Sequence, residues 1–403
     1  VPHLRFPEFH GEWEKCKVSD LLDFYSTNSL SWDQLEYGTD NMLNLHYGLI
    51  HVGLPTMVDL SKDILPAIKK ENEPKNFELC KEGDIAFADA SEDTNEVAKA
   101  IEFYTLEDKA VVCGLHTIHG RDKSNKTVVG YKGYAFSSTA FHHQIRRIAQ
   151  GTKIYSISAK NFAECYIGIP SKEEQTRIVK LLRLIDERIA TQSKLIEKLE
   201  SLIKGINQRV FLNSGINYKI REICEIKSGY SGSQLLSKKG LKVSRIETIS
   251  GHKVNMERVG YVAPFESSEN YRLRVGDILF SNINSVEYIG NTAFIDKDYD
   301  IYHGMNLLRL TPNNMVVIPF YLYLLLNTNR MLNRFKTVCN KAVSQASINQ
   351  TELGKTVVQI SDINAQKQIC KLYQALYDKL ESEKYANSLF QKQKQYLLRQ
   401  LFI

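Results

Sequence analysis

One stretch of the chain, residues 171–213, constrains the fold more than any other. Between Ile178 and Val210 apolar residues recur at alternating spacings of four and three, with one polar interruption at Gln192. This is the heptad pattern of a coiled-coil helix. Its end signals are a capping-box pattern and a helix stop, formed by Ser171 with Glu174 and by Asn213-Ser214-Gly215. At 1.5 Å per residue the helix would be roughly 50 Å long, so it needs a partner helix.

A second copy of this pattern lies 191 residues further along, between Ile369 and Leu401. Motifs before the two helices also repeat, namely Gly83-Asp84-Ile85-Ala86-Phe87 with Gly276-Asp277-Ile278-Leu279-Phe280, and Ile157, Phe162 and Ile169 with Ile348, Leu353 and Ile360. The repetition predicts an internal duplication in which a mixed α/β globular unit followed by a long helix occurs twice.

The two long helices can be each other's partners if they pair antiparallel. With their ends flush, Gln192 falls opposite Asn387, and both are polar residues in otherwise apolar seams. A buried amide pair of this kind would fix the register of the helices. The alternative is that both amides lie at a solvated edge.

Composition sets only broad limits on location and partners. A chain of 403 residues should form two or more domains, and its net charge of +6 is weak support for a polyanionic partner. No apolar run reaches the length of a membrane span, and seven cysteines without a CxxC pair indicate reduced thiols. No signal-peptide pattern opens the chain, so we expect a cytoplasmic protein. Because the sequence begins with Val1, we expect that its numbering starts after processing or at an engineered start.

Short motifs in a fixed order resemble the specificity subunits of type I restriction–modification enzymes. They are Leu4-Arg5-Phe6-Pro7-Glu8-Phe9, Gly11-Glu12-Trp13-Glu14, the two Gly-Asp-Ile strands, Ile169-Pro170, Ile360-Ser361, Glu173-Glu174-Gln175 and Arg209-Val210-Phe211. The resemblance covers essentially the whole chain. One departure is that the second helix begins at Ser361-Asp362-Ile363-Asn364, without the Pro and the Glu cap of the first.

The resemblance implies an α+β fold with two duplicated α/β target-recognition domains, separated by two long antiparallel coiled-coil helices and related by a pseudo-twofold axis. The expected parts are a first domain at 1–170, a helix at 171–213, a second domain at 214–360 and a helix at 361–403. Each domain would read one half of an asymmetric bipartite site in double-stranded DNA, and the helices would set the spacer between the halves. We therefore expect that changing the helix length changes the spacer and leaves the half-sites alone.

The family pattern further implies a non-catalytic chain without a cofactor of its own. Two methylation subunits and the restriction (translocase/nuclease) subunits would be its partners, and these would carry S-adenosylmethionine, ATP and Mg. Neither a phosphate-binding Walker loop nor a Gly-rich dinucleotide fingerprint is present in the sequence. The alternative function is a non-nucleic-acid coiled-coil adaptor that organises other proteins.

Candidate DNA contacts are polar and cationic residues in loops and helix ends, because such side chains contact bases and phosphates. In the first domain they are Arg121, Lys123, Lys126, Tyr131 and Lys132, and then His142, His143, Arg146 and Arg147. In the second domain they are Arg245, Lys253, Arg258, Asn282, Asn284, Ser285, Lys341 and Gln345. Each of them could instead be an ordinary solvated side chain.

The first long helix carries more apolar surface than one seam needs. Leu181, Leu195 and Leu202 each precede a seam position by one residue, which widens the apolar stripe. They favour a docking face for other helical subunits, although packing onto the chain's own domains would also use them.

Cys113, His116 and His119 have the side chains of a metal site at close spacing. On a strand, however, this spacing would place them on alternating faces, and no fourth ligand is evident. We therefore expect no metal site.

Overall fold

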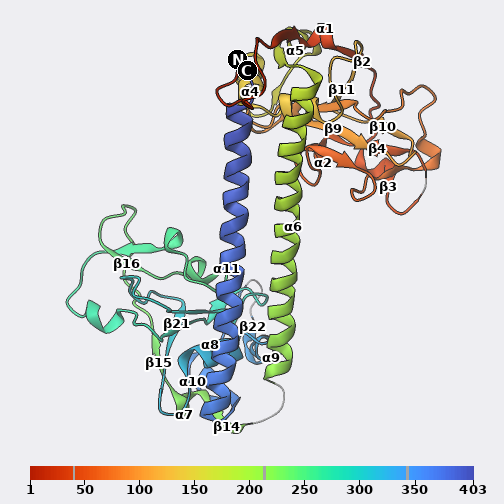
Figure 1. The fold of residues 1–403 in the computed structure, drawn as a ribbon. Helices are drawn as coiled ribbons and strands as arrows, with labels where there is room; N and C mark the ends of the chain where they lie inside the picture. Colours follow the sequence, from red (N-terminus) through yellow and green to blue (C-terminus); the bar gives the residue numbers. More distant parts are fainter. Residues whose placement is uncertain (40, 212–214, 342–344) are drawn as a thin grey trace. The chain divides into compact units, whose positions relative to one another are not determined.

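The computed structural model describes residues 1–39, 41–211, 215–341 and 345–403 and divides into two compact units. Unit 1 comprises Val1–Ser193 and Tyr385–Ile403, and unit 2 comprises Lys194–Lys384. Each unit combines one globular domain with parts of the two long helices, α6 (Lys172–Val210) and α11 (Ile363–Gln400) (Figure 1). The stop predicted at Asn213-Ser214-Gly215 includes residues that lie outside the described ranges.

The globular part of unit 1 is built mainly from short strands and short helices. Its strands are β1 (Glu14–Lys17), β2 (Leu22–Tyr25), β3 (Leu35–Glu36), β4 (Leu43–Leu45), β5 (Met57–Asp59), β6 (Ala67–Ile68), β7 (Ile85–Ala88), β8 (Ala90–Ser91), β9 (Ala100–Thr105), β10 (Val111–Cys113), β11 (Thr117–Asp122), β12 (Tyr155–Ser156) and β13 (Tyr166–Ile169). Its helices are α1 (Val18–Leu21), α2 (Tyr47–His51), α3 (Tyr131–Phe136), α4 (Thr139–Ile148) and α5 (Ala159–Ala163).

Unit 2 repeats this plan with fewer strands. Its strands are β14 (Ile216–Lys219), β15 (Cys224–Ser228), β16 (Leu241–Val243), β17 (Gly260–Val262), β18 (Ile278–Ser281), β19 (Ile283–Asn284), β20 (Thr292–Phe294), β21 (Leu307–Pro312), β22 (Asn340–Lys341), β23 (Ala346–Ser347) and β24 (Val357–Ile360). Its helices are α7 (Ile220–Ile223), α8 (Pro319–Leu326), α9 (Asn329–Val338) and α10 (Gln350–Lys355), with short 3₁₀ turns at Ile246–Ile249 and Met256–Arg258.

The strand order confirms the predicted duplication. The main sheet of unit 1 has the order β2-β11-β7-β9-β5, and that of unit 2 has the matching order β15-β21-β18-β20. The pair β1 with β13 in unit 1 likewise corresponds to β14 with β24 in unit 2. The matched apolar residues that precede the two long helices are all buried, namely Ile157, Phe162 and Ile169 in unit 1 and Ile348, Leu353 and Ile360 in unit 2. The same framework therefore occurs twice, because each copy buries the same positions of the repeated sequence.

The two units differ in what is inserted into this framework. Between β2 and β7, unit 1 carries most of a further sheet of order β10-β4-β6-β3. Between β15 and β18, unit 2 carries only the two-stranded sheet of β16 and β17. The framework is thus common to the two units, and the inserted segments distinguish them.

The long helices pair antiparallel within each unit. In unit 1, Asp186 of α6 bonds Lys394 of α11 at 2.6 Å, and Ser193 accepts a hydrogen bond from Asn387 at 3.5 Å. In unit 2, Asn207 accepts a hydrogen bond from the Tyr373 hydroxyl at 3.2 Å. Each of these partners on α11 lies one residue beyond the position expected from flush ends, whereas Phe390, whose ring lies 5.5 Å from the Arg188 guanidinium, lies one residue before it. The contacts therefore fall on both sides of the flush position, and the predicted register stays a prediction.

The predicted amide pair consists of Gln192 and Asn387. Gln192 is buried, with 6% of its surface exposed, so it does lie within the packed seam. Asn387, however, donates its Nδ2 hydrogen bond to the Ser193 hydroxyl, and its Oδ1 has no hydrogen-bond partner among the described residues. The side chain of Asn387 therefore contacts Ser193, which is the neighbour of its predicted partner Gln192.

The start of α6 explains part of the N-terminal motif. The Glu174 backbone N–H donates to the Ser171 hydroxyl at 3.3 Å, which is one half of the predicted capping box. The Glu174 carboxylate instead accepts hydrogen bonds from Arg5 at 2.8 and 2.7 Å and from the Trp13 indole at 3.3 Å. The other half of the predicted capping box, in which the Glu174 carboxylate accepts the Ser171 backbone N–H, is therefore wrong. Arg5 and Trp13 donate hydrogen bonds to this carboxylate instead.

The second helix has a different cap. The Asp362 carboxylate accepts hydrogen bonds from the backbone N–H groups of Asn364 and Ala365 at 2.9 and 3.1 Å. Asp at this position satisfies backbone donors at a helix N-terminus, so α11 needs no Glu cap. Within the described ranges, no helix is both long and apolar enough to cross a membrane.

Candidate nucleic-acid interface

Arg121, a predicted DNA contact, is held inside unit 1. Its guanidinium bonds both oxygens of Asp84 at 2.8 Å and one oxygen of Glu78 at 2.6 Å, and only 18% of the side chain is exposed. The hydrogen bonds that Arg121 donates to Asp84 are the main reason that the pKa of Arg121 is raised. In unit 2 the Thr311 hydroxyl bonds Asp277 of the second Gly-Asp-Ile motif at 2.6 Å. Both contacts fasten the motif's Asp to the neighbouring strand, so the role of Arg121 is structural.

The remaining predicted residues of that cluster are also engaged within unit 1. Tyr131 is fully buried and donates its hydroxyl to the Gly168 carbonyl at 2.6 Å, and buried Lys132 pairs with Glu102 at 3.1 Å. Lys123 donates to the Ser19 carbonyl and Lys126 pairs with Glu14. Burial excludes Tyr131 and Lys132 as surface contacts, which corrects the prediction for these two residues.

The second predicted cluster of unit 1 does form one surface, on α4. The Ser138 hydroxyl caps this helix by accepting from the Phe141 N–H at 3.2 Å, and Phe141 and Ile145 bury one face of it. The opposite face presents exposed His143 and Arg147. Such an amphipathic helix places its polar residues together on the solvent side.

Arg146 is oriented on this surface by two polar neighbours. Its guanidinium donates to Asn95 at 3.2 Å and lies 3.0 Å from His143 Nδ1. Burial, aided by the charge of Arg146, lowers the pKa of His142, so His142 is neutral at neutral pH. An arginine held in position in this way suits phosphate or base contacts.

The predicted polar residues around β19 come together in unit 2. Asn284 and Lys341 both stand opposite Ala346 in the sheet of β19, β23 and β22, and Asn282 accepts the Ile348 N–H at 2.8 Å through its backbone carbonyl. The Asn282 side-chain oxygen has no partner among the described residues. Ser285 and Gln345 are exposed at the two ends of these segments. This sheet therefore gathers amide and ammonium groups on either side of Ala346, with Asn284 and Lys341 on the two outer strands.

Arg245 and Arg258 form a second group in unit 2. Thr248 joins them, because its hydroxyl accepts from the Arg245 N–H at 2.9 Å and donates to the Arg258 carbonyl at 2.5 Å. Both arginine side chains belong to exposed residues. Lys253 is instead paired with Glu381 of α11 at 2.7 Å, so the structure separates it from this pair.

The duplication reveals polar residues that inspection of the loops missed. Thr328 caps α9 by accepting from the Met331 N–H at 3.3 Å, as Ser138 caps α4, and α9 buries Met331 and Phe335 in the same way. In this alignment Asn333 corresponds to His143, and Lys336 corresponds to Arg146. The repeat offset was the signal that could have found them.

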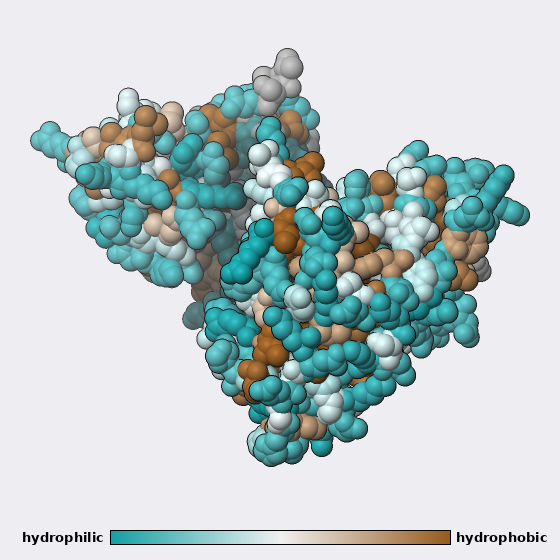
Figure 2. All heavy atoms as spheres, turned by 90° about the horizontal axis from the view of Figure 1, so that it is seen from above, coloured by the Kyte–Doolittle hydropathy of each residue, from teal (hydrophilic) through white to brown (hydrophobic). Residues whose placement is uncertain are grey.

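A face of the molecule in Figure 2 is mainly hydrophilic, with hydrophobic residues in small patches.

The predicted docking leucines do not share one environment. Leu181 packs against the core of unit 1, which favours the alternative of packing onto the chain's own domain. Leu195 and Leu202 remain 37% and 50% exposed on the part of α6 in unit 2. Of the three predicted leucines, these two are the exposed ones.

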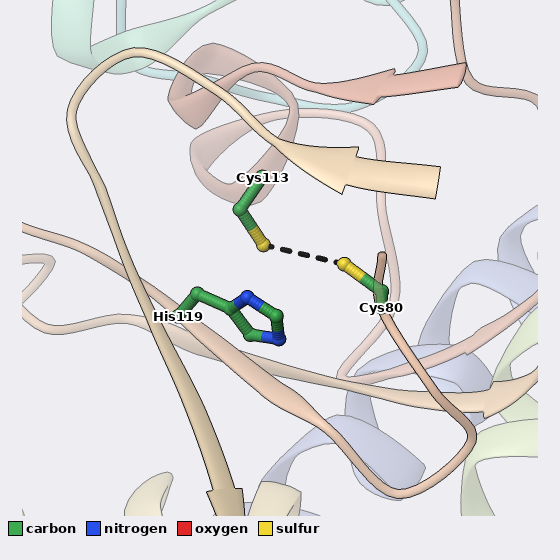
Figure 3. Close-up of side chains that lie close together, drawn as sticks. All are labelled: Cys80, Cys113 and His119. Atoms are coloured by element: carbon green, nitrogen blue, oxygen red, sulfur yellow. Dashed lines mark hydrogen bonds between the residues drawn. The ribbon is translucent and has the colours of Figure 1, made fainter. Parts of the chain in front are cut away.

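The residues with metal-site chemistry are rearranged relative to the sequence prediction. Cys113 and His119 point toward each other, and they are joined by Cys80 (Figure 3). His116 is exposed and lies beside Asp89 at 3.2 Å. The prediction of alternating faces is wrong because Cys113 ends β10, whereas His119 belongs to β11.

Comparisons with known proteins identify the family. The sequence matches the family described as Type I restriction modification DNA specificity domain twice, over residues 11–201 and 216–388. A putative type I restriction enzyme MjaX specificity subunit from Methanocaldococcus jannaschii is 40% identical over 163 residues, which are 39% of this chain and 38% of that protein. A HindI specificity subunit from Haemophilus influenzae is 27% identical over 32% of this chain and 28% of its own length. These matches therefore span well under half of the curated relatives.

Solved structures show the same fold over the whole chain. An S subunit of a type I restriction–modification system from M. genitalium matches with a TM-score of 0.57 and 18% identity, covering 100% of this chain and 99% of its own. A chain from a study of complex assembly and conformational transition of the type I R-M system gives 0.62 and 16%, with 98% of both chains covered. The duplicated framework, the two family matches and this likeness agree: the chain belongs to the family of type I restriction modification DNA specificity domains and carries two of them in tandem.

Proposed function

We propose that this chain is the DNA-reading, non-catalytic subunit of a type I restriction–modification complex. Each globular domain reads one half of an asymmetric, interrupted site in double-stranded DNA. The observation that carries the proposal is the repetition of one framework with different polar residues at matching positions, such as Arg146 and Lys336. Major-groove readout depends on the donors and acceptors of such side chains, so two different sets should read two different half-sites.

The proposal is tested by selection from random-sequence duplexes, using the chain together with its methylation subunit. We expect enrichment of two short, dissimilar words at a fixed separation. Failure to enrich any word, even at low salt, would favour the coiled-coil adaptor. In the DNA-reading proposal, methylation and cleavage are the work of the partner subunits, with S-adenosylmethionine, ATP and Mg bound there, in the cytoplasm.

Replacing both Arg146 and Arg147 by alanine should weaken DNA binding. Removing two phosphate contacts should lower affinity about 10- to 30-fold at physiological salt and reduce the slope of log K against log salt by about 2. Fluorescence anisotropy on the selected duplex at several salt concentrations measures both quantities. The matched control replaces Lys172 and Lys180, two exposed cations of α6, and should leave the slope unchanged. An unaltered slope in the Arg146/Arg147 variant would remove α4 from the interface.

We further propose that Leu195 and Leu202 dock a methylation subunit. They are seven residues apart and thus lie on one face of α6, and both are exposed. Leu202→Glu should reduce recovery of the methylation subunit in co-purification at least tenfold, because a carboxylate would be buried at the contact. Ser201→Glu adds the same charge to the neighbouring exposed residue and should have little effect. Equal recovery with the two variants would place the docking face elsewhere.

A further inference from the structure

Three buried side chains of unit 1 converge in a way that the DNA-reading function does not use. The Sγ atoms of Cys80 and Cys113 are 3.6 Å apart, and a ring nitrogen of His119 completes a set whose atoms all lie within 4.8 Å of one another. Figure 3 shows Cys80 on the segment before β7, Cys113 at the end of β10 and His119 on β11, with all three pointing inward. The separation of the sulfurs is close to the about 3.8 Å expected for two thiolates on a tetrahedral Zn²⁺ with 2.3 Å bonds.

The imidazole of His119 is oriented by a carboxylate, and its second nitrogen remains available for a metal ion. His119 is fully buried, and its Nε2 is 2.8 Å from the carboxylate of Asp84. This contact places the proton on Nε2 and leaves the lone pair on Nδ1. Nδ1 has no partner among the described residues, and in Figure 3 it faces the two sulfurs. A carboxylate that holds one imidazole nitrogen while the other faces a metal is the usual outer arrangement of zinc sites.

In unit 2 an arginine occupies the position of the repeated framework that corresponds to His119 in unit 1. Arg309 stands opposite Leu279 in β18, just as His119 stands opposite Ala86 in β7, so the two occupy the same place in the repeated sheet. Arg309 donates hydrogen bonds to the carbonyls of Arg272 and Asn270 at 3.0 and 3.1 Å. It thereby fastens the segment before β18 to β21. An ion held by Cys80 and His119 would make the same connection in unit 1.

We propose that Cys80, Cys113 and His119 bind one Zn²⁺ ion, which fastens the segment before β7 to β10 and β11. Two thiolates and a neutral imidazole balance the charge of Zn²⁺, so the buried site would hold no net charge. A singly charged Cu⁺ would leave a net negative charge there, and Mg²⁺ or Ca²⁺ would prefer oxygen ligands. Binding releases the two thiol protons, and the three side chains leave the fourth coordination position open.

Without an ion Cys80 remains a protonated thiol. Burial is the main cause that raises the pKa of the Cys80 thiol well above its usual value, and the contact with Cys113 adds to it. The backbone N–H of Cys80 donates to the Val111 carbonyl at 2.8 Å, which holds Cys80 beside β10. The ligands are therefore placed by the backbone of the domain and need little rearrangement.

The full chain, purified under reducing conditions and stripped of metal, is titrated with CoCl2 and then with ZnCl2. We expect the near-ultraviolet absorption of thiolate-bound Co²⁺ to saturate at one equivalent and to disappear when Zn²⁺ displaces it. ZnCl2, but not MgCl2, should also raise the unfolding temperature reported by tryptophan fluorescence, since both tryptophans, Trp13 and Trp32, lie in unit 1. No thiolate absorption on the wild-type chain would overturn the proposal, as would a Cys80–Cys113 disulfide in the freshly purified chain.

Variants of two of the three ligands assign the signal to the site. Cys113→Ser and His119→Gln should each lower the apparent Co²⁺ affinity at least tenfold. Cys165→Ser and His116→Ala are matched controls, because Cys165 is a free buried thiol elsewhere in unit 1 and His116 is the neighbouring histidine that the cluster leaves out. Loss of the signal in either control, or its persistence in both ligand variants, would contradict the assignment. The inference does not depend on the proposed reading of DNA.

Discussion

Replacing Glu102 by alanine should lower the free energy of unfolding of unit 1 by about 3–5 kcal/mol. Glu102 is fully buried on β9 and pairs with buried Lys132 at 3.1 Å. Its two oxygens also accept the backbone N–H groups of Gly130 and Gly133 at 2.9 and 2.7 Å. The variant would leave a buried ammonium without its counter-charge and two donors without acceptors at the start of α3, which is the costly way to break a buried pair.

Urea unfolding followed by tryptophan fluorescence measures this loss, because both tryptophans report on unit 1. Glu92→Ala, at an exposed position of the same unit, is the control and should cost about 0.5 kcal/mol or less. Adding Lys132→Met to Glu102→Ala should recover part of the stability, since it removes the stranded charge. A loss of about 1 kcal/mol or less in Glu102→Ala would mean that the pair is not structurally required.

Acidification should destabilise unit 2 through His303. This residue is fully buried, its Nε2 lies 2.9 Å from the Leu307 carbonyl, and burial lowers its pKa to about 4. The unfolded chain binds the proton with the ordinary histidine pKa of about 6.5. Stability is therefore retained above pH 6.5 and falls as the pH drops towards 4, by about 3 kcal/mol in all and about 2 kcal/mol by pH 5.

Hydrogen exchange of peptides from β20 and β21, compared between pH 7 and pH 5 after correction for the intrinsic exchange rate, measures this change. Burial also lowers the pKa values of His142 and His252, so the wild-type profile contains their contributions. His303→Gln isolates the effect, because glutamine keeps a donor and does not titrate in this range. The difference in stability between wild type and variant should shrink by about 2 kcal/mol from pH 7 to pH 5. A constant difference would show that His303 is protonated without penalty.

The parts of the fold that local patterns encode could be predicted from the sequence. The long helices follow from heptad spacing, and the duplicated sheets follow from the paired Gly-Asp-Ile motifs. These motifs have a physical reason: Asp84 and Asp277 each accept a backbone N–H three residues earlier, from Lys81 and Arg274, at 2.9 and 2.8 Å. The helix register rests on the assumption of flush ends, which the seam pattern alone does not fix.

Long-range contacts could not be predicted, and they decide which polar residues are free. Arg121 and Lys132 look like DNA contacts in the sequence, but their partners Asp84 and Glu102 lie 37 and 30 residues earlier in the chain. The third member of the metal cluster, Cys80, is likewise 33 residues before Cys113. In contrast, the α4 residues lie on one short helix, so their clustering followed from sequence spacing.

In the proposed function, two dissimilar domains of one chain each read one half of a single DNA site. The decisive experiment is genome-wide mapping of methylated bases in cells that produce the chain with its methylation subunit. We expect methylation at one motif made of two different words separated by a fixed gap of unspecified bases. When residues 215–360 are exchanged for those of another family member, only one of the two words should change. A single contiguous methylated word, or an exchange that alters both words together, would contradict it.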